Sequence, residues 1–281
     1  MAISASVVKE LRERTGLGMM DCKKALVEVD GDIDAAIEVL RKSSGMKAAK
    51  KAGRIAADGI LGSKVEGGKG VIVEVNCETD FAAKDANFQR FVSTVTEKVF
   101  DAGSSAIESL GLESEREALV QKIGENISIR RAQIIEDDGQ VLEYIHTNGK
   151  IGVLVAMQGG TTELGKDVAM HIAAMNPIVL SPENVPADLV SKEREIYAAQ
   201  AQESGKPPEI VAKMIDGRIK KYLSEISLLE QVFVKDSDKK VGTLLKSEGA
   251  SLSRFVRFEV GEGIEKEGED FAAEVHKQLG S

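Results

Sequence analysis

The sequence predicts a mixed α+β protein with a small helical module at its N-terminus, a core of two subdomains with antiparallel sheets, and an inserted helical hairpin. Three observations lead to this fold class. Apolar residues recur at helical spacing near the N-terminus and then alternate, as strand residues do, from residue 59 onwards. A pattern of glycine, strand, turn and helix occurs twice. A helical pattern interrupted by two adjacent prolines follows the second copy.

The composition sets the bounds of this prediction. The 281 residues are enough for roughly two domains, and 42% apolar content is enough for a core. No apolar run approaches the ~20 residues of a membrane-spanning helix, and the N-terminus lacks the basic start and apolar block of a signal peptide. Cys22 and Cys77 form no CxxC motif, so we predict buried thiols in a protein of the reducing cytoplasm, away from membranes.

The first 54 residues form the predicted N-terminal module. Their apolar spacing predicts three short helices, at 4–15, 19–29 and 32–42. Ser4 and Asp32 are candidate N-caps for the first and third helices, and Gly16 is a candidate stop for the first. A bundle of this size is marginally stable alone. The stretch "SSGMKAAKKAG", residues 43–53, is predicted to be a tether to the core.

Two β-hairpins follow in the core. Residues 59–76 alternate around Gly67-Gly68, and residues 141–157 alternate around Asn148-Gly149, the pair favoured in a type I′ turn. Two further strands are predicted, at 127–135 and 254–260.

The two hairpins begin a faint internal repeat. Gly70 and Gly152 are 82 residues apart, and so are Lys84 and Lys166. Both copies have the order glycine, strand, polar turn, Lys-Asp and helix, which predicts two similar α+β subdomains. We assign them to 55–139 and to 140–186 with 227–262.

Residues 187–226 contain two helical patterns around "SGKPP". Pro207 suits the turn and Pro208 suits the first position of the second helix. This predicts a helical hairpin inserted into the second subdomain. It either packs on its parent domain or protrudes as an arm for a partner.

The net charge of −9 is unevenly distributed. Residues 1–55 carry a net charge of +3 and the remainder carries −12, while residues 41–54 contain six basic residues and no acid. An acidic bulk argues against general nucleic-acid binding. The basic segment is compatible with RNA, with an acidic protein surface, or with a solvated face alone.

No local motif indicates catalysis. His146, His171 and His276 are scattered, and no pair of them has HxxxH spacing. There is no GxxxxGK[ST] phosphate loop, complete dinucleotide fingerprint, nucleophile elbow or zinc signature. We therefore expect a binding protein without cofactor or metal. An enzyme with a dispersed active site is the alternative.

The stretch "EVNCETDFAAKDANF", residues 74–88, places a large aromatic residue on a polar connection between strand and helix. One interpretation is that Asp80 caps the following helix and Phe81 folds back on the core as a hydrophobic staple. The other is that Phe81 and Asp80 form an exposed wedge aimed at another protein, because aromatic anchors dominate binding hot spots.

Two longer stretches carry a family resemblance. "LRERTGLGMMDCKKAL" (Leu11–Leu26) and "EVNCETDFAAK" (Glu74–Lys84) resemble the two signature segments of the bacterial elongation factor Ts family, and the similarity extends over essentially the whole chain. One departure is Ala82, where the family usually has a larger valine. The resemblance implies a guanine-nucleotide exchange factor for elongation factor Tu, with no covalent catalysis.

The resemblance also implies an architecture. The family has a three-helix N-terminal module resembling a ubiquitin-associated domain, a two-subdomain core, a coiled-coil dimerisation arm and a C-terminal helical module. These parts correspond here to 1–54, to the two subdomains, to 187–226, and to 263–281. The arm implies a homodimer. The N-terminal module and the first subdomain are expected to bind the GTPase domain of elongation factor Tu, and the second subdomain a β-barrel domain.

Site residues follow from the same resemblance. Thr79, Asp80, Phe81 and Ala82 are expected to push towards the Mg²⁺ site of the partner and displace the ion. Further contacts are expected from residues of the N-terminal module and of the second hairpin, namely Arg12, Met19, Met20, Lys23 and His146. An RNA-binding or assembly protein that uses residues 41–54 remains a competing class, and it gives Phe81 no role.

Overall fold

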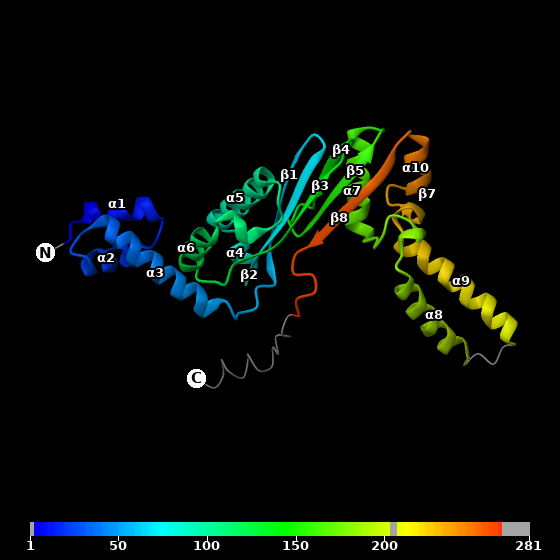
Figure 1. Ribbon diagram of the computed structural model, residues 1–281, viewed down its shortest axis with the longest axis horizontal. Helices are drawn as coiled ribbons and strands as arrows, with labels where there is room; N and C mark the ends of the chain where they lie inside the picture. The colour runs from blue at the N-terminus through cyan, green and yellow to red at the C-terminus, as the bar shows by residue number, and fades with distance from the viewer. Residues whose placement is uncertain (1–2, 203–206, 266–281) are drawn as a thin grey trace.

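The computed structural model describes residues 3–202 and 207–265. The N-terminal helices lie at one end of an elongated molecule, two β-sheets with their helices lie in the middle, and a pair of helices lies at the other end (Figure 1). Helices and antiparallel strands are both abundant, which confirms the predicted α+β class.

Three helices form the N-terminal module: α1 (Ala5–Thr15), α2 (Met19–Glu28) and α3 (Ile33–Lys51). Ser4 and Asp32 cap α1 and α3 through bonds from the backbone N–H groups of Val7 and Ala35. Gly16 ends α1 in the left-handed conformation, with φ of 68°. The three predicted local signals are confirmed. The module has its own apolar core, built from Val8, Leu11, Leu17, Cys22, Ala25, Leu26, Ala36 and Leu40.

The predicted tether is wrong, because α3 continues to Lys51. Its second half packs on α6 (Glu113–Ile123) of the core. Ala48 is buried in the main core cluster, and the Ser44 hydroxyl donates to Gln121 Oε1 at 2.5 Å. Alanine and lysine are strong helix formers, so packing on the core extends a helix across a Ser-Ser-Gly sequence that locally indicates a break.

The first subdomain has a sheet with strand order β1-β2-β3. The strands are β1 (Asp58–Glu66), β2 (Lys69–Cys77) and β3 (Ser128–Glu136). Between β2 and β3 lie the short helix α4 (Asp80–Ala83), the long helix α5 (Ala86–Ala102), a 3₁₀ turn and α6. Buried side chains of α5, including Phe88 and Val95, pack on β1 and β2.

The second subdomain has a sheet with strand order β4-β5-β8. The strands are β4 (Gln140–Ile145), β5 (Ile151–Gln158) and β8 (Ser251–Glu259). Helix α7 (Thr162–Met175) packs on β4 and β5. The smaller strands β6 (Val232–Phe233) and β7 (Asp236–Lys240) and the helix α10 (Val241–Ser247) complete the subdomain.

The two sheets share an apolar cluster. It contains Leu61, Ile72 and Ile135 from the first sheet and Val141, Leu154 and Phe258 from the second. Gly152 lies in this contact, where a Cβ atom would come within 2.8 Å of Ile72. The repeat therefore places two glycine-containing strands where the subdomains meet.

The faint sequence repeat has a structural counterpart. Each subdomain has a hairpin, a helix after the central strand, and a third strand antiparallel to that central strand. The register shifts between Glu74 and Val75 in the first sheet and between Ala156 and Met157 in the second, again 82 residues apart. These matching bulges support two similar subdomains.

Both predicted hairpins are present, but the type I′ turn is wrong. Asn148 lacks the positive φ that this turn requires, and only Gly149 has one, at 69°. The Gly149 N–H donates to His146 O at 2.7 Å, and the His146 N–H donates to Ile151 O at 2.9 Å. The result is a longer loop, 146–150, between β4 and β5.

The hairpin at 187–226 consists of α8 (Ala187–Gln202) and α9 (Pro208–Ile226). Pro207 is the N-cap of α9 and Pro208 its first residue, as predicted. Ile215 and Ile219 are buried against α8 side chains such as Tyr197. The hairpin extends from the rest of the second subdomain (Figure 1). Of the predicted C-terminal module, only residues 263–265 lie within the described part of the chain.

A buried charge cluster ties the end of β8 to the first sheet. The fully buried Glu74 accepts bonds from the Gly261 N–H at 2.8 Å, from Arg130 at 3.0 Å and from Arg131 at 2.6 Å. Burial alone would raise the pKa of Glu74, but these hydrogen bonds offset it and lower the pKa below its ordinary value.

Candidate partner-binding turn

The turn after β2 presents an aromatic side chain to solvent. Phe81 is 79% exposed, more than any other large apolar side chain in residues 3–202 and 207–265. Its neighbours Ala82 and Ala83 are buried in the core of the first subdomain. The staple interpretation is therefore wrong, because α4 is anchored by its two alanines and Phe81 points away from the core.

The capping residue also differs from the prediction. Thr79, not Asp80, is the N-cap of α4, and its hydroxyl accepts a bond from the Ala82 N–H at 3.3 Å. Asp80 instead accepts from Lys84 at 2.6 Å, one turn along. This hydrogen bond is the main reason that the pKa of Asp80 is lowered. Lys84 Nζ lies 5.7 Å from the centre of the Phe81 ring, so the aromatic and the carboxylate share one cationic neighbour.

A buried thiol lies beneath the turn. The Cys77 S–H donates to Thr79 O at 3.2 Å, and burial raises the pKa of the thiol to about 12. Cys22 is also buried and free, which confirms the prediction of two buried thiols. A thiol with so high a pKa is chemically inert, so its contribution here is packing.

The expected contacts of the N-terminal module lie on its surface. Met19 and Met20 begin α2 and are more than half exposed, and Arg12 and Lys23 are also exposed. Figure 1 shows α1 and α2 at the end of the molecule and α4 within the core. The two helices that carry these four residues thus lie apart from α4.

The exposed His146 lies on the loop between β4 and β5, and its Nδ1 is 2.9 Å from the Tyr144 hydroxyl. This loop crosses onto the first subdomain, because Lys150 pairs with Asp58 and the Leu61 N–H donates to Gly149 O at 2.9 Å. Lys150 also contributes to the lowered pKa of Asp80, after Lys84. The loop that carries His146 is thus bound to β1 at Asp58, whose partner in β2 is Cys77, two residues before Thr79.

The second subdomain has further exposed apolar side chains that no sequence pattern indicates. They are Met175, Ile178, Val232 and Val234, each about half exposed. The buried His171 connects two of their segments, because its Nδ1 accepts from the Val234 N–H at 3.1 Å and its Nε2 is 3.0 Å from Gln231 Oε1. Met175 ends α7, Val232 is in the two-residue strand β6, and Ile178 and Val234 lie in connections, so no single periodic pattern contains the four residues.

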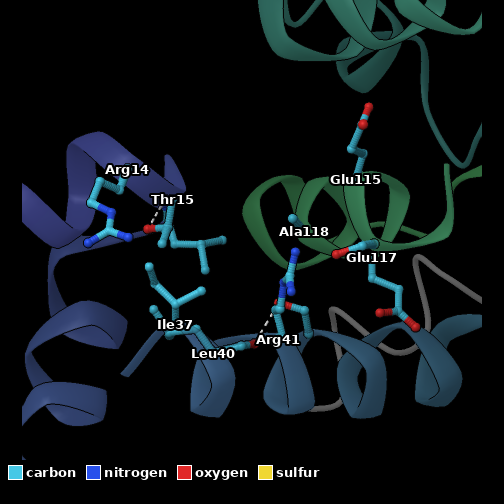
Figure 2. A pocket seen from close by; sticks show the side chains of 11 residues that line it. Arg14, Thr15, Ile37, Leu40, Arg41, Glu115, Glu117 and Ala118 are labelled. Carbon is cyan, nitrogen blue, oxygen red and sulfur yellow. Dashed lines mark hydrogen bonds between the residues drawn. The ribbon is translucent and has the colours of Figure 1, made fainter. Parts of the chain in front are cut away.

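A cleft of about 330 Å³ lies between the first part of the N-terminal module and α6 (Figure 2). Leu40 and Ile37 line it from α3, and Ala118 lines it from α6. Arg41 from one side and Glu117 from the other also line the cleft. No histidine or cysteine lines this cleft.

Within the described ranges, no three or more His, Cys, Asp and Glu side chains are grouped so that they could bind a metal ion. None of the helices in residues 3–202 and 207–265 is both long and apolar enough to cross a membrane.

Comparison with known sequences decides the family. The sequence profile of "Elongation factor TS" matches residues 78–262. A protein named elongation factor Ts from Hahella chejuensis is 62% identical over 99% of both chains. Those from Teredinibacter turnerae and Saccharophagus degradans are 60% and 58% identical over 99% of this chain and 98% of theirs.

The chain belongs to the elongation factor Ts family. It is thus a member of a family of translation elongation factors. The matched region includes the turn, 79–82, and His146, but it begins after the N-terminal module. The similarity to the elongation factor Ts of the three organisms covers that module as well.

Proposed function

We propose that this protein binds the GDP-bound form of elongation factor Tu and promotes GDP release, so that GTP can rebind. One observation carries the proposal: Phe81 is 79% exposed on the short helix α4, beside the Asp80 carboxylate. The Phe81 ring lies outside the core of the chain, and aromatic side chains are frequent anchors at protein interfaces.

The mechanism we propose is thermodynamic linkage. A GTPase binds GDP partly through Mg²⁺, which neutralises phosphate charge. Phe81 and Asp80 would favour a state of the partner in which the Mg²⁺ and phosphate sites are displaced. A protein that binds this state better must weaken nucleotide binding by the same factor, and GTP rebinding would in turn expel it. No covalent step and no cofactor are involved.

Three surfaces would share the binding. In this proposal the module 1–54 contacts the GTPase domain through the exposed side chains at the start of α2, and the first subdomain, 55–139, contacts it through the turn. The second subdomain, 140–186 with 227–262, contacts a β-barrel domain. The exposed apolar side chains of Met175, Ile178, Val232 and Val234 support the last assignment, because exposed apolar surface is frequent at interaction sites.

We propose that the arm, 187–226, forms a homodimer. Its two helices expose Ile196 and Ile210 although they have a common core. A second arm would cover these side chains. We also propose that residues 263–281 form a C-terminal module and that the protein acts in the cytoplasm.

The competing RNA-binding function has less support. Three of the six basic residues in 41–54 already have partners within the chain. Lys47 pairs with Asp21 at 3.3 Å, Arg54 pairs with Glu78 at 3.6 Å, and Lys51 donates to Gly124 O. Few free cations remain to neutralise phosphates.

Stopped-flow release of a fluorescent GDP from purified elongation factor Tu tests the proposal. Addition of this protein should accelerate release in a saturable way, and more strongly when Mg²⁺ is present. Unchanged release at all concentrations of this protein would refute the proposal. Salt-dependent binding of RNA at the same concentrations would instead favour the competing function.

A further inference from the structure

Two carboxylates connect the turn after β2 to the loop before β3. Glu125 Oε2 accepts from the backbone N–H groups of Glu78 and Thr79, both at 3.0 Å, and its Oε1 accepts from the Thr79 hydroxyl at 2.6 Å. In return, Glu78 Oε1 accepts from the Asn126 N–H at 2.6 Å. We call Glu78 and Glu125 with these bonds the carboxylate clasp.

The clasp fixes the residue that starts α4. The Thr79 hydroxyl donates to Glu125 and accepts from the Ala82 N–H, so both functions of the group are in use. Its side chain therefore has one orientation, and the axis of α4 is set relative to the loop before β3. Bonds to an ionised acceptor are stronger than neutral ones, so one carboxylate with three donors is a rigid anchor. Phe81 is two residues beyond Thr79 and inherits this orientation.

The same loop also holds the chain that enters from the N-terminal module. The Asn126 side chain donates to Arg54 O at 2.8 Å, and the Arg54 guanidinium lies 3.6 Å from Glu78. Residues 54, 78–79 and 125–126 thus form one hydrogen-bonded unit. Sequence alone gave no sign of it, because its members are dozens of residues apart.

We infer that Glu125 is a positioning residue for Phe81. It keeps the turn in one orientation before the partner binds. Binding then loses less conformational entropy at Phe81, which makes the binding free energy more favourable. The inference rests on the proposed exchange function for its consequence, but the orientation itself is a property of the free protein. The two can be tested separately.

The first test follows the orientation directly. The chain contains no tryptophan, so Phe81→Trp introduces a single indole at the turn, which can be excited selectively over the three tyrosines. Time-resolved anisotropy of the introduced indole should show little nanosecond motion in the single variant. Adding Glu125→Ala should add a fast component of large amplitude. Adding Glu115→Ala instead should leave the decay unchanged. Glu115 is an exposed carboxylate on α6 whose partner is Lys98 on α5. An unchanged decay with Glu125→Ala would overturn the inference, whatever the exchange assay shows.

The second test is a double-mutant cycle in the exchange assay. Glu125→Ala should lower the maximal stimulated rate of GDP release about tenfold, the effect of losing hydrogen bonds to a charged group. In a Phe81→Ala background the same change should have less than about a twofold effect, because Glu125 acts through Phe81. Equal effects in both backgrounds would show that Glu125 acts by another route and overturn the inference.

A conservative variant guards against a folding defect. Glu125→Gln keeps the shape and one acceptor oxygen but loses the charge, and we expect an intermediate loss of rate with unchanged near-ultraviolet circular dichroism. If wild-type protein fails to accelerate GDP release, the proposed function fails while the anisotropy result still stands. If wild-type protein accelerates release and Glu125→Gln and Glu125→Ala match it, the positioning role fails alone.

Discussion

The turns after the two central strands, β2 and β5, occupy the same place in the two subdomains. Thr79 and Thr161 are 82 residues apart, and each caps the next helix with its hydroxyl, at 3.3 Å and 3.1 Å from the capped N–H. Two residues beyond the caps, however, the exposed positions hold Phe81 in one copy and Glu163 in the other. The fold is therefore compatible with a charged residue at the position of Phe81.

The supports of the two turns differ as well. Glu125 binds the first turn through three hydrogen bonds. In the second, Gly159 has a positive φ of 70° and lies so close to Gly249 that a Cβ would come within 2.2 Å of its carbonyl oxygen. Both supports come from the loop before the third strand. Close backbone packing is enough to make the turn, so a charged anchor indicates a further demand for orientation at Phe81.

The helices that follow also differ. Helix α7 is continuous, whereas in the first copy α4 ends at Ala83 and Asp85 caps a new helix, α5. The Asp85 carboxylate accepts from the Asn87 N–H at 2.7 Å. Phe81 is thus carried on a separate helical turn, which projects it from the sheet independently of the long helix.

The largest expected effect concerns stability, at the two matching bulges. Glu74 is the buried acceptor of Gly261, Arg130 and Arg131, whereas the corresponding position holds Ala156. Glu74→Ala leaves the arginines without their buried partner, so we expect a loss of ~3–5 kcal/mol in the free energy of unfolding. Urea denaturation measures it. A loss of less than ~1 kcal/mol would show that the buried charge cluster contributes little to the stability of the first subdomain.

The pH dependence of the free energy of unfolding is a second test of the same cluster. The pKa of Glu74 is lower in the folded chain than its ordinary value of 4.5, so its stabilising contribution is complete above pH 4.5. It is lost as the pH falls from 4.5 through the folded-state pKa, because the unfolded state then binds the proton more readily. Glu74→Gln should therefore flatten the acid limb of the stability curve.

The next largest effect tests the contrast between Phe81 and Glu163. Phe81→Ala should slow stimulated GDP release by about 30-fold or more, corresponding to ~2–4 kcal/mol at a hot spot. The loss should be greater at saturating Mg²⁺ than at low Mg²⁺. Stability should change by no more than ~0.5 kcal/mol, since the side chain is exposed.

Glu163→Ala is the matched control, at the corresponding position of the second copy. It should leave both exchange and stability unchanged. Normal exchange from folded Phe81→Ala protein would contradict the proposed role of the turn. Equal losses from both variants would show that the comparison of the two turns has no functional meaning.

Local signals in the sequence predicted the local structure well. Ser4, Gly16 and Asp32 delimit helices as expected, and Gly67-Gly68 joins two strands. The sequence pattern identifies the turn around Phe81. It does not distinguish Asp80 from Thr79 as the cap, because aspartate and threonine are both good caps. Only the backbone conformation distinguishes them, and here Thr79 is extended while Asp80 is helical.

The sequence does not predict the features that depend on contacts between distant parts of the chain. The second half of α3 is helical because it packs on α6, as the bond from Ser44 to Gln121, 77 residues further along the chain, shows. Glu125 is a single charged residue in a loop, without a motif of its own. Its role depends on a turn 46 residues earlier, and no local pattern contains that information.

A smaller effect is expected at the N-terminal module, whose exposed side chains give a scale for Phe81. Met20→Ala should weaken the binding of elongation factor Tu by about tenfold, the size expected for an interface contact of ~1–2 kcal/mol. The maximal rate of GDP release should stay near the wild-type value, because Met20 would add affinity without disturbing the nucleotide site. Titration of the rate against protein concentration separates the two quantities.

Met46→Ala on α3 controls for the loss of an exposed methionine side chain outside these surfaces, because Met46 is 63% exposed, as against 64% for Met20. It should leave both quantities unchanged. A fall in maximal rate with Met20→Ala, at full saturation, would place the module in the displacement step and contradict this division of roles.

The smallest effect separates the two threonine caps. Thr79→Ala and Thr161→Ala each remove a helix N-cap, which costs ~0.5–2 kcal/mol, so we expect similar losses in urea denaturation. Only Thr79 also donates its hydroxyl to Glu125, so only Thr79→Ala should slow stimulated GDP release, by severalfold at saturation. Thr79→Ser keeps the hydroxyl that accepts from Ala82 and donates to Glu125, and it should restore both properties. If Thr161→Ala slows release as much as Thr79→Ala, exchange depends on overall stability and the orientation of the first turn is irrelevant. If Thr79→Ala loses stability but keeps its full rate, the cap is structural and Phe81 needs no fixed orientation to act.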